Sequence, residues 1–234
     1  LLKRALFLVS AENEVEPLVE FAKVFKKRYN VKVDAVYVKD ILKYDVFPVT
    51  VEGIGINLGT NFAYKEFRNI ENKTFEKIKG RLEEEFSKVY TKEGESAEVA
   101  LEELKKYDLM VTVKNEKISP YMKELLRSIY KPLIVLPNRK NFKIENLLLL
   151  DDGAYNANKT LFTFFYMFDE QKVNVLRVNV EADESNEKLS ERFGDNYNLI
   201  LKEGDTFKTI MEESKKYDFV LMGDLRYTVM VERI

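Results

Sequence analysis

At 234 residues the chain is long enough for two domains of roughly 100–140 residues each. Its 38 Lys and Arg residues against 40 Asp and Glu give a net charge of −2, so no basic excess favours nucleic-acid binding. Cysteine and histidine are both absent, which excludes disulfides, thiolate or imidazole metal ligands and histidine-dependent catalytic triads. We see no signal peptide and no apolar run of membrane-spanning length, so we expect a cytoplasmic protein without a membrane partner.

The first part of the sequence alternates between apolar strand patterns and helical patterns. Short β-rich apolar runs, typical of strands buried on both faces of a parallel sheet, occur five times. They are Ala5–Val9, Val33–Val38, Val89–Thr91, Leu109–Val113 and Leu133–Leu136. Helical patterns between them cover Val15–Tyr29, Phe67–Phe86, Ser96–Lys106 and Ser119–Ile129. This alternation predicts βαβ units with right-handed crossovers.

A polar stretch after Pro137 is typical of a linker. We therefore assign residues 1–137 to a first domain, 138–145 to a linker and 146–234 to a second domain. The second domain has the same alternation of patterns. We expect strands at Asn146–Leu150, Asn174–Val180, Leu199–Leu201 and Phe219–Met222, and helices at Asn156–Asp169, Ser185–Phe193 and Thr206–Lys216. The expected fold class is α/β, with two tandem doubly wound parallel-sheet domains.

Two segments of the chain match each other in register. Residues 92–108 begin with KEG and end with EELKKYD, and residues 202–218 begin with KEG and end with EESKKYD. An apolar strand pattern follows each, so the two domains are expected to be copies of one unit. The offset between the copies falls from about 141 residues at the first strand to 110 here, which places an insertion of about 30 residues within 41–85.

The order of these motifs resembles that of a tandem universal stress protein. Leu147–Leu150 with Asp151-Asp152-Gly153 resembles the first strand and Asp-Gly turn of such a domain, and Tyr217–Gly223 resembles its fourth strand. Lys131–Pro137 resembles its terminal strand. The resemblance covers nearly the whole chain, twice. It implies an adenine-nucleotide-hydrolase-like fold of five strands per domain, although the second copy ends at Ile234 without a fifth strand.

The same resemblance implies how the domains associate and where a nucleotide would bind. The two domains are expected to form an intramolecular pseudo-dimer through their edge strands, with homodimer formation as an alternative. ATP-binding members of the family have a Gly-x-x-Gly stretch after the fourth strand and a Gly-Ser nine residues later. Such glycines bring backbone N–H donors close to phosphate oxygens. The first copy has no glycine there, and Ser10-Ala11-Glu12-Asn13 replaces its Asp-Gly turn.

The second copy retains part of the pattern. The positions that the resemblance assigns to cofactor binding are Asp151, Asp152, Gly153, Val178, Met222, Gly223 and Arg226. One glycine supplies few donors for a triphosphate and Asp224 would repel it, although Arg226 could contact a phosphate. The two aspartates also fit a turn that caps the next helix, or Mg²⁺ ligands, or an acid/base pair. Without a third convergent group, we expect no catalytic residue and no metal.

Three functions follow as expectations. The first is a non-catalytic stress-response or regulatory protein with a degenerate nucleotide site and no cofactor. The second is an ATP-binding, slowly hydrolysing regulator with a single site in the C-terminal domain. The third is a protein-interaction module that contacts an unknown protein partner through the 41–85 insertion.

Overall fold

The computed structural model describes residues 1–44, 58–168, 171–223 and 228–234. It divides into two compact units, which we call the N-terminal unit and the C-terminal unit. The N-terminal unit comprises Lys3–Asn141, and the C-terminal unit comprises Phe142–Ile234 together with Leu1 and Leu2. The division at Asn141 falls within the linker assigned from the sequence. No helix in the described ranges combines the length and the apolar character needed to cross a membrane.

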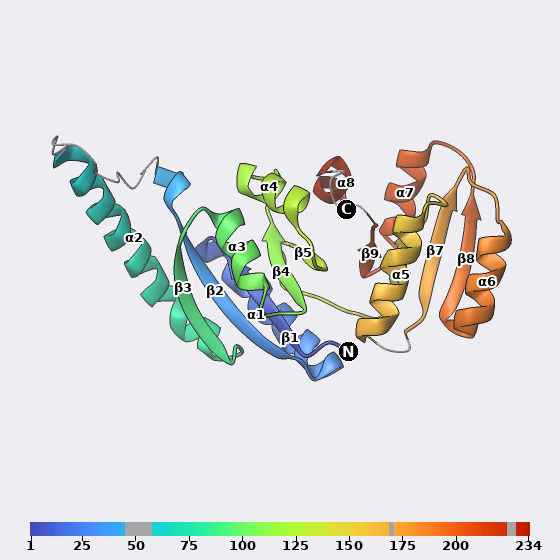
Figure 1. Ribbon diagram of the computed structural model, residues 1–234, viewed down its shortest axis with the longest axis horizontal. Coiled ribbons are helices and arrows are strands. Elements are labelled where there is room, and N and C mark those ends of the chain that lie inside the picture. The colour runs from blue at the N-terminus through green and yellow to red at the C-terminus, as the bar shows by residue number, and fades with distance from the viewer. Residues whose placement is uncertain (45–57, 169–170, 224–227) are drawn as a thin grey trace. The chain divides into compact units, whose positions relative to one another are not determined.

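The N-terminal unit contains a five-stranded parallel sheet of order β3-β2-β1-β4-β5 (Figure 1). The strands are β1 (Arg4–Val9), β2 (Lys32–Asp40), β3 (Lys88–Gly94), β4 (Leu109–Lys114) and β5 (Leu133–Pro137). Along the chain, β1 to β3 are added toward one edge of the sheet and β4 and β5 toward the other, so the strand order reverses between β1 and β4. Open α/β sheets bind ligands at the carboxyl ends of the strands beside such a reversal. The two central strands are almost wholly buried, as expected of strands covered on both faces.

Helices pack on both faces of this sheet. They are α1 (Val15–Tyr29), α2 (Leu58–Glu83), α3 (Ser96–Leu104) and α4 (Pro120–Ser128), with short 3-10 turns η1 (Glu12–Glu14) and η2 (Ile41–Tyr44). Helix α1 ends at Asn30, whose left-handed φ of 51° closes the last turn. Helix α4 begins at Ser119, whose hydroxyl accepts the N–H of Met122. Phe7 of β1 packs against Phe21 and Phe25 of α1 in the core.

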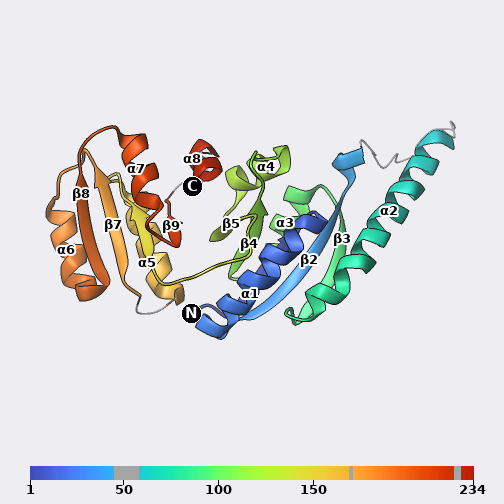
Figure 2. The same ribbon diagram turned by 180° about the vertical axis from the view of Figure 1, so that it is seen from behind.

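The insertion predicted within 41–85 is partly described, and residues 45–57 lie outside the described ranges. Its main element is α2, which runs along β3 (Figures 1 and 2). Phe67 and Leu82 of α2 are buried, and Arg68 forms an ion pair with Glu93 of β3. The helix is longer than the predicted Phe67–Phe86. Because it covers one end of the sheet, the insertion forms part of the N-terminal unit, and its role in partner binding stays a prediction.

The C-terminal unit repeats four of these strands in the same order, β8-β7-β6-β9, all parallel. The strands are β6 (Leu147–Leu150), β7 (Val173–Val178), β8 (Tyr197–Lys202) and β9 (Phe219–Leu221). The helices are α5 (Tyr155–Phe168), α6 (Glu184–Phe193), α7 (Thr206–Ser214) and α8 (Thr228–Arg233), with a 3-10 turn η3 (Gly194–Asn196). The α/β class and the all-parallel strands are thus confirmed. No fifth strand of this sheet lies in the described ranges.

The aspartate of the repeated KKYD segment makes the same contacts in both units. In the N-terminal unit, Asp108 Oδ2 accepts the backbone N–H groups of Lys3 and Arg4, each at 2.8 Å. In the C-terminal unit, Asp218 Oδ2 accepts the N–H groups of the two residues before β6, each at 3.0 Å. This carboxylate therefore ties the start of the fourth strand to the start of the first. The preceding glutamate, Glu103 or Glu213, pairs with the same two lysines of its repeat.

The end of β7 differs from the sequence expectation. We predicted a strand to Val180, but β7 ends at Val178 because Asn179 adopts a left-handed φ of 57°. The Asn179 amide accepts the N–H of Gly204 at 2.9 Å and donates to its carbonyl oxygen at 2.7 Å. These two hydrogen bonds fix the turn between β8 and α7 and end the strand two residues early.

Candidate functional site

Asp151 lies at the carboxyl end of β6 and is buried, with 5% of its surface exposed. Its Oδ2 accepts the Nε–H of Arg177 at 2.8 Å, and its Oδ1 accepts the N–H of Gly153 at 2.8 Å. Arg177, on β7, is only 1% exposed and also contacts Asp183 at 3.2 Å and the carbonyl oxygen of Glu181 at 2.8 Å. Burial lowers the pKa of Arg177, but the two carboxylates outweigh it and raise that pKa overall. Asp151 is thus held by a neighbouring strand and by its own turn.

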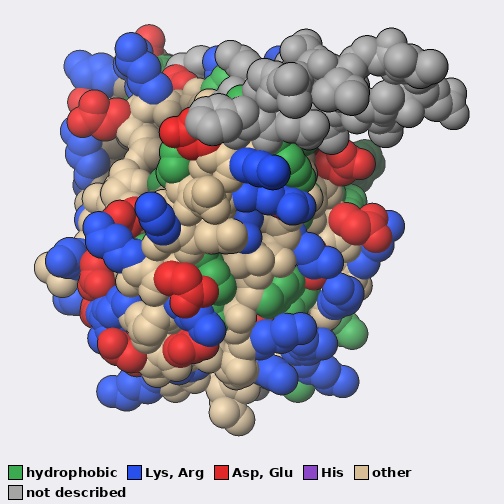
Figure 3. Space-filling view, turned by 90° about the vertical axis from the view of Figure 1, so that its left-hand side faces the viewer, with side chains coloured by type: hydrophobic (Ala, Val, Ile, Leu, Met, Phe, Trp, Pro, Cys, Tyr) green, Lys and Arg blue, Asp and Glu red, His purple; other side chains and the backbone are tan. Residues whose placement is uncertain are grey.

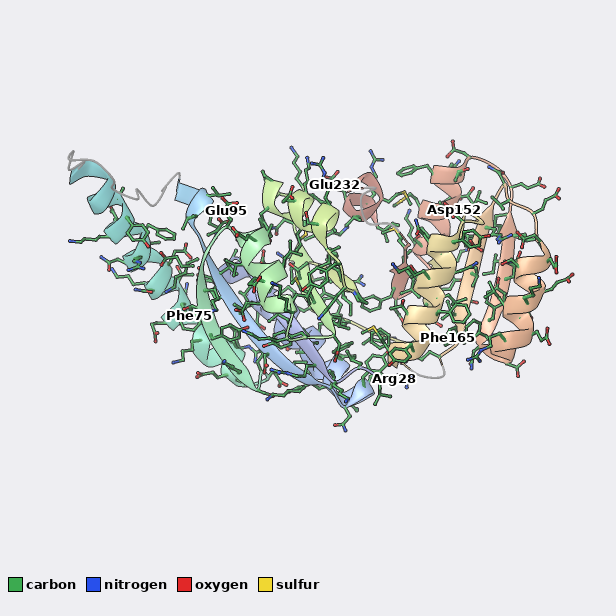
Figure 4. The ribbon with its side chains drawn as sticks, viewed as in Figure 1. Arg28, Phe75, Glu95, Asp152, Phe165 and Glu232 are labelled. Carbon is green, nitrogen blue, oxygen red and sulfur yellow. The ribbon has the colours of Figure 1, made fainter. Side chains whose placement is uncertain are left out.

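Asp152 and Gly153 complete the turn. Asp152 is exposed, and its Oδ1 accepts the N–H of Ala154 at 3.0 Å. It lies at the end of the sheet toward which the β7 and β8 arrows point (Figure 4). Gly153 has a φ of +82°, a left-handed conformation that favours glycine. The two amides at the entrance of α5 are therefore already bonded to carboxylates of the same turn.

Two of the remaining predicted positions, Val178 and Gly223, have packing contacts. Val178 is 8% exposed and packs in an apolar cluster with Leu148 and Leu176. Met222 and Gly223 follow β9 directly. A Cβ on Gly223 would lie 2.7–2.8 Å from backbone atoms of Asn156, so only glycine fits against the first turn of α5. Arg226 lies outside the described residues, and its phosphate contact stays a prediction.

The structure brings the six described positions of the predicted set to one end of the C-terminal sheet, but their polar groups do not converge. Asp151 faces Arg177 in the interior, whereas Asp152 is exposed. Over the described ranges, no three His, Cys, Asp or Glu side chains gather closely enough to hold a metal ion. In the described part of this turn, the Asp151 and Asp152 carboxylates are already hydrogen-bonded. Because they do not converge, nothing in this geometry supports the prediction that they act as a general acid/base pair.

Sequence reasoning missed Arg177, which is central to this network. An arginine within the apolar run Val173–Val178 is unusual, because a buried guanidinium requires anionic partners. The arginine within this apolar strand pattern was the signal in the sequence that could have identified the buried ion pair. Its partners, 26 residues earlier and 6 residues later in the chain, become evident only from the fold.

The equivalent turn of the N-terminal unit contains a second buried carboxyl group that the sequence analysis also missed. Glu14 of η1 is 1% exposed, and its Oε2 accepts the N–H of Ser10 at 2.7 Å. Burial raises the pKa of Glu14 to about 7, against opposing effects of the Ser10 and Ala11 amides and of Lys43. In both units, then, a carboxyl group of the chain itself accepts an amide of the turn after the first strand.

Comparisons with known proteins support the fold. No protein-family description matches the sequence, and no curated protein matches it. Among solved structures, a universal stress protein from Archaeoglobus fulgidus DSM 4304 superposes with a TM-score of 0.66 at 12% identity, covering 96% of this chain and 89% of that one. A hypothetical protein aligns with 58% of this chain and 96% of its own at 18% identity, with a TM-score of only 0.32. The chain has the fold of a universal stress protein.

Proposed function

We propose that this chain is a non-catalytic regulatory protein of the stress-response type, whose ligand-site turns are closed by its own carboxyl groups. The observation that carries this proposal is the turn after β6. There Asp151 and Asp152 accept the N–H groups of Gly153 and Ala154. These two amides lie in the turn just before α5, and amides in such turns and at helix N-termini are donors that a phosphate uses. A triphosphate would have to displace two carboxylates and would meet their negative charge.

The N-terminal unit supports the same proposal from a different residue. Its turn after β1 lacks both aspartates, yet Glu14 accepts the Ser10 amide from within the protein interior. The packing of Gly223 on α5 adds to this, because it accounts for that glycine without a phosphate. Regulation would then depend on contacts with proteins and not on nucleotide turnover. The pseudo-dimer of the two units and homodimer formation belong to this proposal as predictions.

The second candidate is a regulator that binds ATP in the C-terminal unit. Two observations favour it: the Asp152 side chain is exposed, and Gly153 is an exposed glycine with a left-handed φ. Val178, Met222 and Gly223 lie at the same end of the sheet and would contact the nucleotide. We rank this candidate second because the turn amides it needs already have acceptors.

Calorimetric titration of the full chain with ATP and Mg²⁺ separates the two candidates. We expect no saturable heat of binding below about 1 mM nucleotide. Micromolar affinity that Asp152→Ala abolishes, and that Asp195→Ala retains, would overturn the proposal in favour of ATP binding. Asp195 is a matched control because it is an exposed aspartate in η3, outside the turn.

A further inference from the structure

Two contacts hold the backbone of Ser10, which follows β1 at the point where the strand order of the N-terminal sheet reverses. Glu14 Oε2 accepts its N–H at 2.7 Å, and Lys43 Nζ of η2 donates to its carbonyl oxygen at 2.6 Å. Glu14 is 1% exposed, whereas its neighbour Glu12 is exposed and pairs with Lys77 of α2. The buried Glu14 carboxyl group therefore holds the backbone of the turn after β1, whereas the Glu12 carboxylate pairs with a lysine of α2.

The charged and titratable groups around Glu14 do not neutralise a carboxylate there. Among the described residues, no Lys or Arg nitrogen lies within the 4.0 Å of an ion pair with Glu14, although Lys43 lies close enough to lower its pKa. Asp40, at the end of β2, is occupied by Ser96 Oγ at 2.9 Å and by the N–H of Leu42 at 3.0 Å. Tyr121 of α4 is near enough for Glu14 and Asp40 to raise its pKa in addition to burial. A buried carboxylate without a close cation is unfavourable.

Two further side chains at this point have hydrogen-bonding capacity that the described structure leaves unused. Ser10 Oγ and Thr112 Oγ1 of β4 are buried and make no hydrogen bond of good geometry among the described residues, although both lie close enough to the Tyr121 hydroxyl to lower its pKa. Buried hydroxyls without partners weaken a closed arrangement, because water would satisfy them if the turn opened. The closed turn therefore depends on the contacts of Glu14. It buries the hydroxyl groups of Ser10 and Thr112, which water would solvate if the turn opened.

We propose that Glu14 is a proton-controlled latch: the neutral carboxyl group keeps the turn after β1 closed, and the ionised group leaves the interior and releases Ser10. Opening exposes the Ser10 and Thr112 hydroxyls at the carboxyl ends of β1 and β4. The sign follows from linkage, since the buried group has a pKa of about 7 against 4.5 when free. The opening equilibrium then rises about tenfold per pH unit between these values and levels off above the higher one.

Hydrogen exchange of the full chain, measured by mass spectrometry on peptides that span residues 8–16, tests the latch. After correction for the intrinsic exchange rate, protection should fall roughly 40-fold between pH 5 and pH 7 and only about twofold more by pH 8. Glu14→Gln keeps an acceptor for the Ser10 amide and should make protection independent of pH. Glu12→Gln, the exposed neighbour in the same 3-10 turn, should keep the wild-type profile.

A second measurement does not depend on a variant that folds. In the wild-type chain with ¹³C-labelled glutamate carboxyl groups, the resonance assigned to Glu14 through its contact with the Ser10 amide should titrate near pH 7. Titration of Glu14 near its usual 4.5 would overturn the latch. Equal pH dependence of exchange in Glu14→Gln and wild type would overturn it as well.

Discussion

The two units have the same strand order but close the turn after their first strand in different ways. In the C-terminal unit the buried acid Asp151 has a buried cation, Arg177, at 2.8 Å. In the N-terminal unit the buried acid Glu14 has backbone amides, and Lys43 is engaged by the Ser10 carbonyl oxygen. A paired acid retains its charge in the interior, whereas an unpaired one gains protons more readily. One fold thus holds an ion-paired acid in one copy and, in the other, an acid whose pKa burial raises to about 7.

Breaking the buried ion pair should have the largest effect. Arg177→Met leaves the Asp151 carboxylate in the interior without a cation, so we expect the free energy of unfolding of the C-terminal unit to fall by about 3–5 kcal/mol. Urea unfolding followed by circular dichroism measures this. Arg192→Met, which removes an exposed arginine from over Phe193, is the control and should cost less than about 1 kcal/mol. A loss below 1 kcal/mol for Arg177→Met would show that the pair contributes little.

Replacing the titrating acid Glu14 should give the next largest effect. The free energy of unfolding should rise in this case, whereas it falls when the ion pair is broken. The folded state holds the Glu14 proton more tightly than the unfolded state, so this group's stabilising contribution is present below pH 4.5 and is lost as the pH rises through 7. Glu14→Gln removes that loss and should raise the unfolding free energy near pH 8 by up to about 3 kcal/mol relative to the wild type.

Near pH 4 the two proteins should have almost equal stability, because Glu14 is then neutral in both states. Denaturant unfolding at several pH values gives the comparison, with Glu12→Gln as the matched exposed variant. A constant difference between Glu14→Gln and wild type across this range would contradict the assignment of a neutral buried Glu14.

The repeated aspartates should give the smallest and most similar effects. Asp108→Ala and Asp218→Ala each leave two backbone N–H groups without their carboxylate, so each should cost about 2 kcal/mol in its own unit. Native-state hydrogen exchange resolves the two units separately. Losses that differ by more than about twofold between the units would argue against an equivalent role in both copies.

Much of the fold could be predicted from the sequence, because strands buried on both faces have a strong apolar signal. The runs at Leu109–Val113 and Leu147–Leu150 are of this kind, and the repeat at KKYD placed the corresponding strands in register. The predicted end of β7 was wrong because the left-handed conformation of Asn179 is stabilised by its hydrogen bond with Gly204, a contact made across the sheet. Local sequence patterns do not contain that information.

The candidate site was predicted less completely. The sequence identified Asp151, Asp152 and Gly153 as a turn that could bind a nucleotide, cap the next helix, ligate Mg²⁺ or act as an acid/base pair. The structure shows the hydrogen bonds from the Gly153 and Ala154 amides to the two aspartates within this turn. Arg177 and Glu14 were missed, because their importance comes from burial beside residues distant in sequence or from burial alone. A charged residue becomes informative only when the fold shows what surrounds it.

We propose above all that the chain's own carboxylates occupy the turn amides that a nucleotide would need. The most direct test is the amide NMR spectrum of the full chain during titration with ATP and Mg²⁺, read at Gly153 and Ala154. We expect these two resonances to stay unchanged up to about 1 mM nucleotide. Saturable shifts at both amides, with micromolar affinity, would show that a phosphate displaces Asp151 and Asp152 and would contradict this proposal.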